Sequence, residues 1–128
     1  MSPMLSRKPR LLLLDDDPSM QRLVTALLTK EGYRVDVVSS GAQAIEKVDK
    51  EEYAALLLDV MTPTEGGLTV IGHLRKTTPK MMKRTVLVTG SPQSVLHSVE
   101  NDVFAIVRKP FEAKELVSTI ARLIKRAG

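Results

Sequence analysis

The sequence contains no cysteine and no tryptophan, and only 3% of its residues are aromatic. Without cysteine the fold has neither disulfides nor thiolate-bound metals, which suits the reducing cytosol. No apolar run approaches the roughly 20 residues that a membrane-spanning helix needs. Residues 1–10 also lack the apolar core of a signal peptide. We therefore expect a cytoplasmic protein that does not engage a membrane.

The chain carries a net charge of +4, but its basic residues are divided among short groups. These groups are Arg7, Lys8 and Arg10; Lys80, Lys83 and Arg84; and Lys125 with Arg126. Binding of nucleic acid usually needs a continuous basic face, with aromatic side chains on which bases stack. No predicted helix concentrates the positive charge and aromatic residues are scarce. We therefore expect solvated loops and helix ends at these positions, and no direct binding of nucleic acid.

Short apolar runs alternate with segments of helical periodicity along the whole chain of 128 residues. The predicted strands are residues 11–14, 34–38, 54–58, 85–88 and 103–107. The predicted helices begin at residue 18, after Ser40, at residue 68, at about residue 92 and at about residue 112. Continuous hydrophobicity indicates strands that are buried on both faces. Five β-α repeats predict an α/β fold with a doubly wound parallel sheet and helices on both faces.

Several residues predict where these elements begin and end. Asp17 before Pro18 is typical of a helix N-terminus, and Gly32 is typical of the left-handed residue that follows a helix. Ser40 with Gln43 predicts a capping box. The fourth helix is expected to end near Asn101, the fifth near Lys125, and residues 80–84 are expected to form a solvated loop. Residues 1–8 are predicted to be a flexible tail and residues 9–128 one domain.

Polar side chains follow the predicted strands at the point where each strand ends. They are Asp15 and Asp16 after the first strand, Asp59 after the third, Thr89 after the fourth and Lys109 after the fifth. Because ligands of open parallel sheets bind beyond the carboxyl ends of the strands, we expect these side chains to converge there. Three carboxylates in one place repel each other unless a cation binds. Their oxygens suit Mg²⁺, and a lysine with a hydroxyl suits a phosphoryl group.

This pattern resembles the receiver domain of two-component response regulators. The residues that carry the resemblance are Asp15-Asp16, Asp59 with Pro63, Thr89-Gly90 and Lys109-Pro110-Phe111. They occur in this order, each at a predicted strand end, and the resemblance covers the chain from about residue 10 to residue 127. It implies a flavodoxin-like (βα)5 fold with the strand order 2-1-3-4-5.

The resemblance also implies a role for each of these residues. Asp59 would accept a phosphoryl group from phosphohistidine on a sensor histidine kinase or a histidine phosphotransfer protein. Asp16, Asp59 and the backbone carbonyl of Met61 would bind Mg²⁺ directly, and Asp15 would act through a metal-bound water. The phosphoryl group would be bound by Thr89, Gly90 and Lys109, and the Lys109-Pro110 peptide would be cis. The protein would assist its own phosphorylation and dephosphorylation without being an enzyme, and would switch a surface that binds a downstream effector.

One departure from the family concerns this switch. Thr89 and Ile106 occupy the two switch positions, but Ile106 stands where the family usually has tyrosine or phenylalanine. Isoleucine is stiff at χ1 and has no ring to rotate. Phe104 is expected on the same side of the strand. We therefore expect phosphorylation to act mainly on residues 90–102. No output domain follows the last predicted helix, so the chain fits a stand-alone receiver or a part of a longer regulator or hybrid kinase.

Three other classes share some of these features. A phosphatase of the haloacid dehalogenase type would carry phosphate on Asp15, but Pro18-Ser19 does not continue the motif of that family. A flavodoxin-like electron carrier needs a phosphate-binding loop rich in hydroxyls and glycine after the first strand, and aromatic residues around the flavin. Both are missing from this sequence. A degenerate receiver would bind partners without phosphorylation, which the intact acidic set argues against. His73 and His97 have no neighbouring ligand residues and are expected to be surface or boundary histidines.

Overall fold

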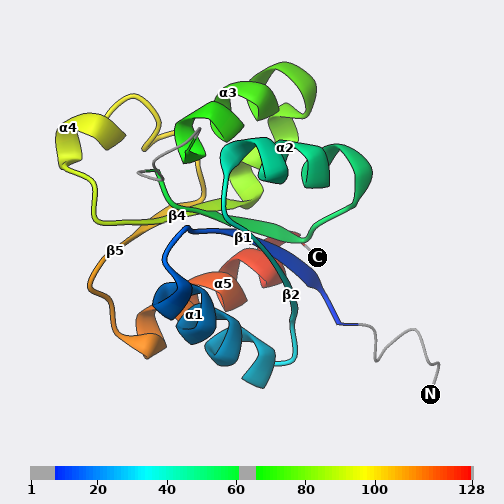
Figure 1. The fold of residues 1–128 in the computed structure, drawn as a ribbon, viewed down its shortest axis with the longest axis vertical. Coiled ribbons are helices and arrows are strands. Elements are labelled where there is room, and N and C mark those ends of the chain that lie inside the picture. Colours follow the sequence, from blue (N-terminus) through cyan, green and yellow to red (C-terminus); the bar gives the residue numbers. More distant parts are fainter. Residues whose placement is uncertain (1–7, 61–65, 128) are drawn as a thin grey trace.

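Figure 1 shows a central sheet between two layers of helices in the computed structural model, which describes residues 8–60 and 66–127. The strands are β1 (Arg10–Leu14), β2 (Arg34–Val38), β3 (Ala55–Leu58), β4 (Thr85–Thr89) and β5 (Ala105–Arg108). All four neighbouring pairs are parallel, and the order is β2-β1-β3-β4-β5. The predicted α/β fold and its strand order are therefore confirmed. The predicted tail lies outside the described residues except for Lys8.

The helices divide between the two faces of this sheet. In Figure 1, α2 (Gly41–Lys50) and α3 (Gly67–Thr77) lie on one face, and α1 (Pro18–Lys30) and α5 (Ala113–Ala127) lie on the other. A single-turn helix, α4 (Gln93–Leu96), lies beyond β4, and a 3-10 helix (Pro79–Arg84) precedes that strand. Among the helices in residues 8–60 and 66–127, none has both the length and the apolarity needed to cross a bilayer.

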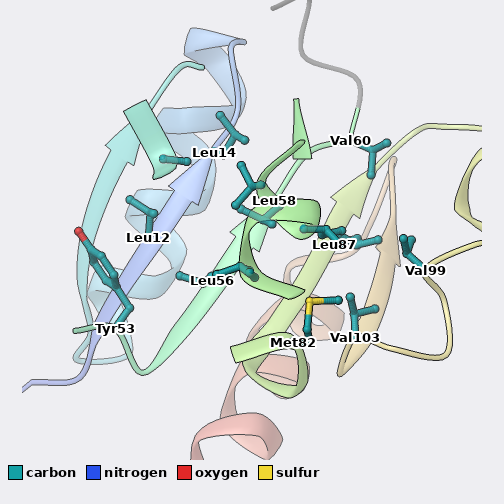
Figure 2. Packing of buried hydrophobic residues seen from close by; sticks show 14 of the residues in the cluster. Leu12, Leu14, Tyr53, Leu56, Leu58, Val60, Met82, Leu87, Val99 and Val103 are labelled. Atoms are coloured by element: carbon teal, nitrogen blue, oxygen red, sulfur yellow. The ribbon is translucent and has the colours of Figure 1, made fainter. Parts of the chain in front are cut away.

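The uniformly apolar strands place successive side chains in two separate cores. Figure 2 shows the core on the α2/α3 side, to which the strands contribute Leu12, Leu14, Leu56, Leu58 and Leu87. The core on the α1/α5 side takes the intervening residues Leu11, Leu13, Ala55, Leu57 and Val86. All of these side chains are at most 1% exposed. Full burial stabilises the fold by about 1.5–3 kcal/mol for each leucine, which explains why alternation is absent from β1, β3 and β4.

The structure confirms the predicted helix signals around α1 and α2. The side chain of Asp17 accepts a hydrogen bond from the Ser19 amide at 2.9 Å, and Pro18 is the first residue of α1. Gly32 has φ of +97°, a conformation that side chains with a Cβ rarely adopt. Ser40 caps α2 by accepting from the Gln43 amide at 3.2 Å. Both helices therefore begin where the sequence predicts.

The prediction of a helix over residues 92–101 is wrong in length. Helix α4 ends at Leu96, and turns follow it to Asp102. The amides of Val99 and Asp102 donate to carbonyls three residues earlier, whereas the Glu100 amide donates to Leu96 four residues earlier, so the hydrogen bonding is mixed and the α-helix does not continue. Serine, histidine, asparagine and aspartate in this stretch are weaker helix formers than alanine or leucine. The Val99 side chain is 2% exposed, so its burial in the core helps to hold residues 97–102 in place.

Two further boundaries differ from the predictions around β4 and β5. Residues 80–84 belong to the 3-10 helix, in which Met82 is buried, and are not a solvated loop. Strand β5 begins at Ala105, because Val103 packs into the α2/α3-side core before the strand starts. Phe104 also precedes β5 and packs on the α1/α5-side core, whereas Ile106 packs on the other core. The expectation that these two side chains share a side is therefore wrong.

A polar network ties β1 to β2 and to the segment before β3. The two terminal nitrogens of Arg10 donate to Asp36 and Glu51, each at 2.8 Å. The hydroxyl of Tyr53 donates to the same Asp36 oxygen at 2.7 Å, and the Arg10 guanidinium lies 5.3 Å from the centre of the Tyr53 ring. Burial favours the neutral carboxyl, but the hydrogen bonds from Tyr53 and Arg10 outweigh burial and lower the pKa of Asp36.

We expect Tyr53→Phe to lower the free energy of unfolding by about 1.5–3 kcal/mol at neutral pH, because one hydrogen bond to an ionised carboxylate is lost. A lowered pKa means that the Asp36 carboxylate stabilises the fold above its ordinary value of 3.8, and that this contribution is lost as the pH falls through the folded-state pKa. The difference between wild type and variant should therefore shrink below pH 3.8. Urea unfolding of wild type and variant at neutral pH and below pH 3.8 measures this difference, with Tyr33→Phe as the control. An equal difference at both pH values would contradict the assignment.

Candidate functional site

Three carboxylates gather at the carboxyl ends of the adjacent strands β1 and β3. One oxygen from each of Asp15, Asp16 and Asp59 lies within 4.8 Å of the others. Asp15 and Asp59 are buried, with 1% and 7% exposure, whereas Asp16 is exposed. The structure thus brings together the three side chains that the sequence analysis singled out as metal ligands. Met61, the fourth predicted ligand, lies outside the described residues.

Lys109 bridges two of these carboxylates from the far end of β5. Its Nζ atom lies 2.7 Å from Asp15 Oδ2 and 3.0 Å from Asp59 Oδ2. Burial opposes the charge of this lysine, but the hydrogen bonds to Asp15 and Asp59 outweigh burial and raise its pKa. The amine is therefore protonated at neutral pH. The Lys109-Pro110 peptide is cis, as predicted.

The carboxylate of Asp15 is held on both of its oxygens. Its Oδ1 atom accepts from the Asp17 amide at 2.9 Å, and its Oδ2 atom accepts from Lys109. The Gln21 side chain donates to the Asp15 carbonyl. The carboxylate of Asp17 instead caps α1, which confirms the prediction that this residue is an N-cap.

The backbone of Asp59 is held by hydrogen bonds on both sides. Its amide donates to the Leu14 carbonyl at 2.9 Å, and its carbonyl accepts from the Gly67 amide at 2.9 Å. A Cβ atom on Gly67 would lie only 2.9 Å from the Asp59 carbonyl oxygen. The first residue of α3 must therefore be glycine for the helix to approach this closely. The sequence analysis missed this role, although the paired glycines shortly after Asp59 are a signal for it.

Thr89 and Lys109 are joined through the backbone, because the Lys109 amide donates to the Thr89 carbonyl at 3.0 Å. The Thr89 side chain is fully buried, and its hydroxyl oxygen lies 2.9 Å from the hydroxyl oxygen of Ser91. The Ser91 amide also donates to Thr89 Oγ1 at 3.1 Å. Gly90 is exposed, and a Cβ there would meet the Lys109 side chain at 3.9 Å. The partnership of Thr89 with Ser91 was not predicted.

The donor set of the acidic cluster fits Mg²⁺. The three side chains that could bind a metal ion all offer carboxylate oxygens, the ligands that hard divalent cations prefer. Three carboxylates and one ammonium group leave two negative charges among these four side chains. A divalent cation compensates that charge, and the exposed Asp16 leaves one side of the cluster open to solvent.

A parallel sheet in this order, with an acidic cluster and a lysine at its carboxyl end, defines a receiver-type signalling domain. The chain belongs to the response regulator receiver domain family, whose family model matches residues 11–121. The transcriptional regulatory protein TcrA of Mycobacterium tuberculosis is 32% identical over 120 residues, which cover 91% of this chain and 46% of that protein. The chain spans about half the length of the curated relatives that it matches.

Two solved structures that share the fold contain magnesium. The response regulator TrrA of Thermotoga maritima, in complex with Mg²⁺ and BeF, is 28% identical with a TM-score of 0.81, covering 90% of this chain and 98% of that one. The receiver domain of a sensor histidine kinase from Pseudomonas aeruginosa PAO1 is 25% identical with a TM-score of 0.82, covering 93% and 99%. That structure has a magnesium ion coordinated in its active site cleft.

We expect Gly67→Ala to destabilise the protein by about 1–3 kcal/mol, as overpacking does elsewhere, because the new Cβ would press on the Asp59 carbonyl. Gly72→Ala in the same helix is the matched control. A Cβ there meets nothing within 4 Å, so alanine should stabilise the helix by about 0.5–1 kcal/mol. Thermal unfolding of both variants measures the difference. Equal stabilities of the two variants would show that the close approach at Gly67 is unimportant.

We expect Asp16→Ala to abolish binding of Mg²⁺ in a calorimetric titration, because it removes the exposed carboxylate of the cluster. The metal-free variant should be more stable than wild type, since repulsion is relieved. Asp17→Ala removes the same charge from the neighbouring residue. This control should keep the affinity for Mg²⁺ but lose about 1 kcal/mol of stability with its helix cap. Undiminished affinity in Asp16→Ala would contradict the assignment of this residue.

Proposed function

We propose that this receiver domain is the phosphoacceptor of a two-component phosphorelay and that Asp59 takes up the phosphoryl group. The observation that carries the proposal is the placement of Lys109. Its ammonium group lies 3.0 Å from an oxygen of Asp59, within a cluster of three carboxylates whose donor set fits Mg²⁺. A cationic donor beside a carboxylate is the arrangement that a transferred phosphoryl group requires.

In the proposed reaction an Asp59 carboxylate oxygen attacks the phosphorus of a phosphohistidine. A P–O bond to Asp59 forms while the P–N bond to the imidazole breaks, and the electron pair of that bond stays on the imidazole nitrogen. Lys109 donates to one phosphoryl oxygen, and the Thr89 hydroxyl with the Gly90 backbone binds the others. Mg²⁺, when held by Asp15, Asp16 and Asp59, neutralises negative charge on the carboxylates and the phosphoryl oxygens. The protein therefore contributes mainly positioning and charge neutralisation.

The surroundings of Asp15 support Asp59 as the acceptor and disfavour the phosphatase alternative. That alternative needs an aspartate after β1 as the nucleophile. Asp15 is 1% exposed, and both of its carboxylate oxygens accept hydrogen bonds from this chain, one from the Asp17 amide and one from Lys109. Asp59 is more exposed, at 7%, and lies at the end of the neighbouring strand. Lys109 donates to both carboxylates, and Asp59 is the more accessible of the two.

The phosphoryl donor is proposed to be a sensor histidine kinase or a histidine phosphotransfer protein in the cytoplasm. The receiver is a signalling domain that assists its own phosphorylation and dephosphorylation. Its output is proposed to pass to a downstream effector domain or protein. The curated relatives support such an output, since they include transcriptional regulators about twice as long as the matched region. Direct binding of nucleic acid is not proposed for this chain.

We expect wild type to gain the mass of one phosphoryl group when it is incubated with Mg²⁺ and acetyl phosphate, and Asp59→Asn to gain none. The amide keeps the shape of the side chain but is not a nucleophile. Asp102→Asn, which changes an exposed aspartate, is the control and should be labelled like wild type. Peptide mapping locates the label. Label on Asp15, or uptake by Asp59→Asn at the wild-type rate, would overturn the proposal in favour of the phosphatase alternative.

A further inference from the structure

The hydroxyl of Thr89 is engaged with Ser91 and not with the acidic cluster. In residues 8–60 and 66–127, the hydrogen bonds of Thr89 Oγ1 go to the Ser91 hydroxyl at 2.9 Å and the Ser91 amide at 3.1 Å. Both side chains are buried, with exposures of 0% and 2%. A threonine hydroxyl has one proton and two acceptor sites. Two contacts from one residue therefore define the direction in which it points.

This engagement competes with the role that the proposed function gives to Thr89. A hydroxyl that accepts from the amide two residues ahead forms a local turn, and such bonds hold the side chain to its own backbone. The Thr89 hydroxyl has one proton, so a bond donated to a phosphoryl oxygen on Asp59 competes with a bond donated to the Ser91 hydroxyl. The contacts with Ser91 thus stabilise the form that lacks the phosphoryl group.

Ser91 is itself fixed by Arg108 on the neighbouring strand. A terminal nitrogen of Arg108 donates to the Ser91 carbonyl at 2.7 Å. Arg108 is the residue directly opposite Thr89 in the pairing of β4 with β5, and the next residue, Lys109, donates its amide to Thr89. Thr89, Ser91 and Arg108 therefore form a polar link from the site to the edge strand β5.

We propose that Ser91 is a positioning residue that holds the Thr89 hydroxyl away from Asp59 in the unphosphorylated protein, and that Arg108 fixes Ser91 for this task. The inference rests on the proposed function. It assigns to a polar link the coupling between β4 and β5, for which Ile106 supplies no aromatic ring. When Thr89 turns toward the phosphoryl group, the Ser91 hydroxyl loses its contact with Thr89, and residues 90–102 lose one of the contacts that hold them in place.

The test is the affinity for beryllofluoride, a phosphoryl mimic, in the presence of Mg²⁺. We expect Ser91→Ala to bind it about twofold to tenfold more tightly than wild type, because one net hydrogen bond no longer opposes the turn of Thr89. Ser94→Ala, which removes an exposed hydroxyl from α4, is the matched control and should bind like wild type. Calorimetric or NMR titration measures all three affinities.

A second variant keeps the test decisive if Ser91→Ala does not fold. Arg108→Ala removes an exposed side chain and should also tighten binding, though less than Ser91→Ala, with Arg34→Ala at the far end of β2 as the control. Because both substitutions act through one link, the double variant should gain less than the sum of the two effects in free energy. Additive effects would show that Arg108 does not act through Ser91.

The outcomes separate this inference from the function on which it rests. If wild type binds beryllofluoride and the variants bind equally or more weakly, the inference is overturned and the proposed function stands. If neither wild type nor any variant binds it, the proposed function fails. Hydrogen exchange of wild type gives a further check, since the mimic should change protection across residues 90–102 more than around Ile106. A response centred on Ile106, with residues 90–102 unchanged, would also overturn the inference.

Discussion

The contact of Lys109 with Asp15 and Asp59 is the interaction on which the site depends. Two buried carboxylates at adjacent strand ends repel each other, and this repulsion is tolerated only where a positive charge lies between them. Lys109 directly follows β5, and β4 separates β5 from β3 in the sheet. This strand order lets the lysine side chain contact both Asp15 and Asp59. The raised pKa of the lysine keeps that charge in place at neutral pH. Metal binding and phosphoryl transfer, as proposed here, both start from this arrangement.

The fold gives the site its rigidity through the backbone. Asp59 is hydrogen-bonded to β1 through its amide and to the start of α3 through its carbonyl, so its Cα atom is held between a strand and a helix. Behind it, the leucines of β1 and β3 pack on both faces of the sheet without exposure. On the Thr89 side, α4 is one turn long and residues 97–102 form turns. An acidic cluster held by strands and a helix on one side, and a segment built from turns on the other, suit a domain that converts phosphorylation into movement.

Much of this architecture could be predicted from the sequence, because apolar runs that end in carboxylates, Asp15 and Asp59, mark both the strands and the edge of the core. The strand order followed from the family resemblance. The length of α4 could not be predicted, because the same side chains fit an α-helix, with hydrogen bonds between residues four apart, and a turn, with hydrogen bonds between residues three apart. Val103 is apolar whether it lies in β5 or in the turn before it. The contacts of Ser91 with Thr89 and Arg108 depend on side-chain rotamers, for which the sequence contains no pattern.

The all-leucine face of β1 raises a problem of alignment that the two polar ends of the strand solve. A shift of β1 by two residues against β3 would still pair Leu11 with Leu57 and Leu12 with Leu58, so leucine contacts alone distinguish the correct pairing from the shifted one only in part. Arg10, bonded to Asp36 and Glu51 at one end, and Asp15, bonded to Lys109 at the other, cannot both keep their partners after such a shift. The charged residues that flank β1 therefore help to fix its register, which the hydrophobic core alone specifies only in part.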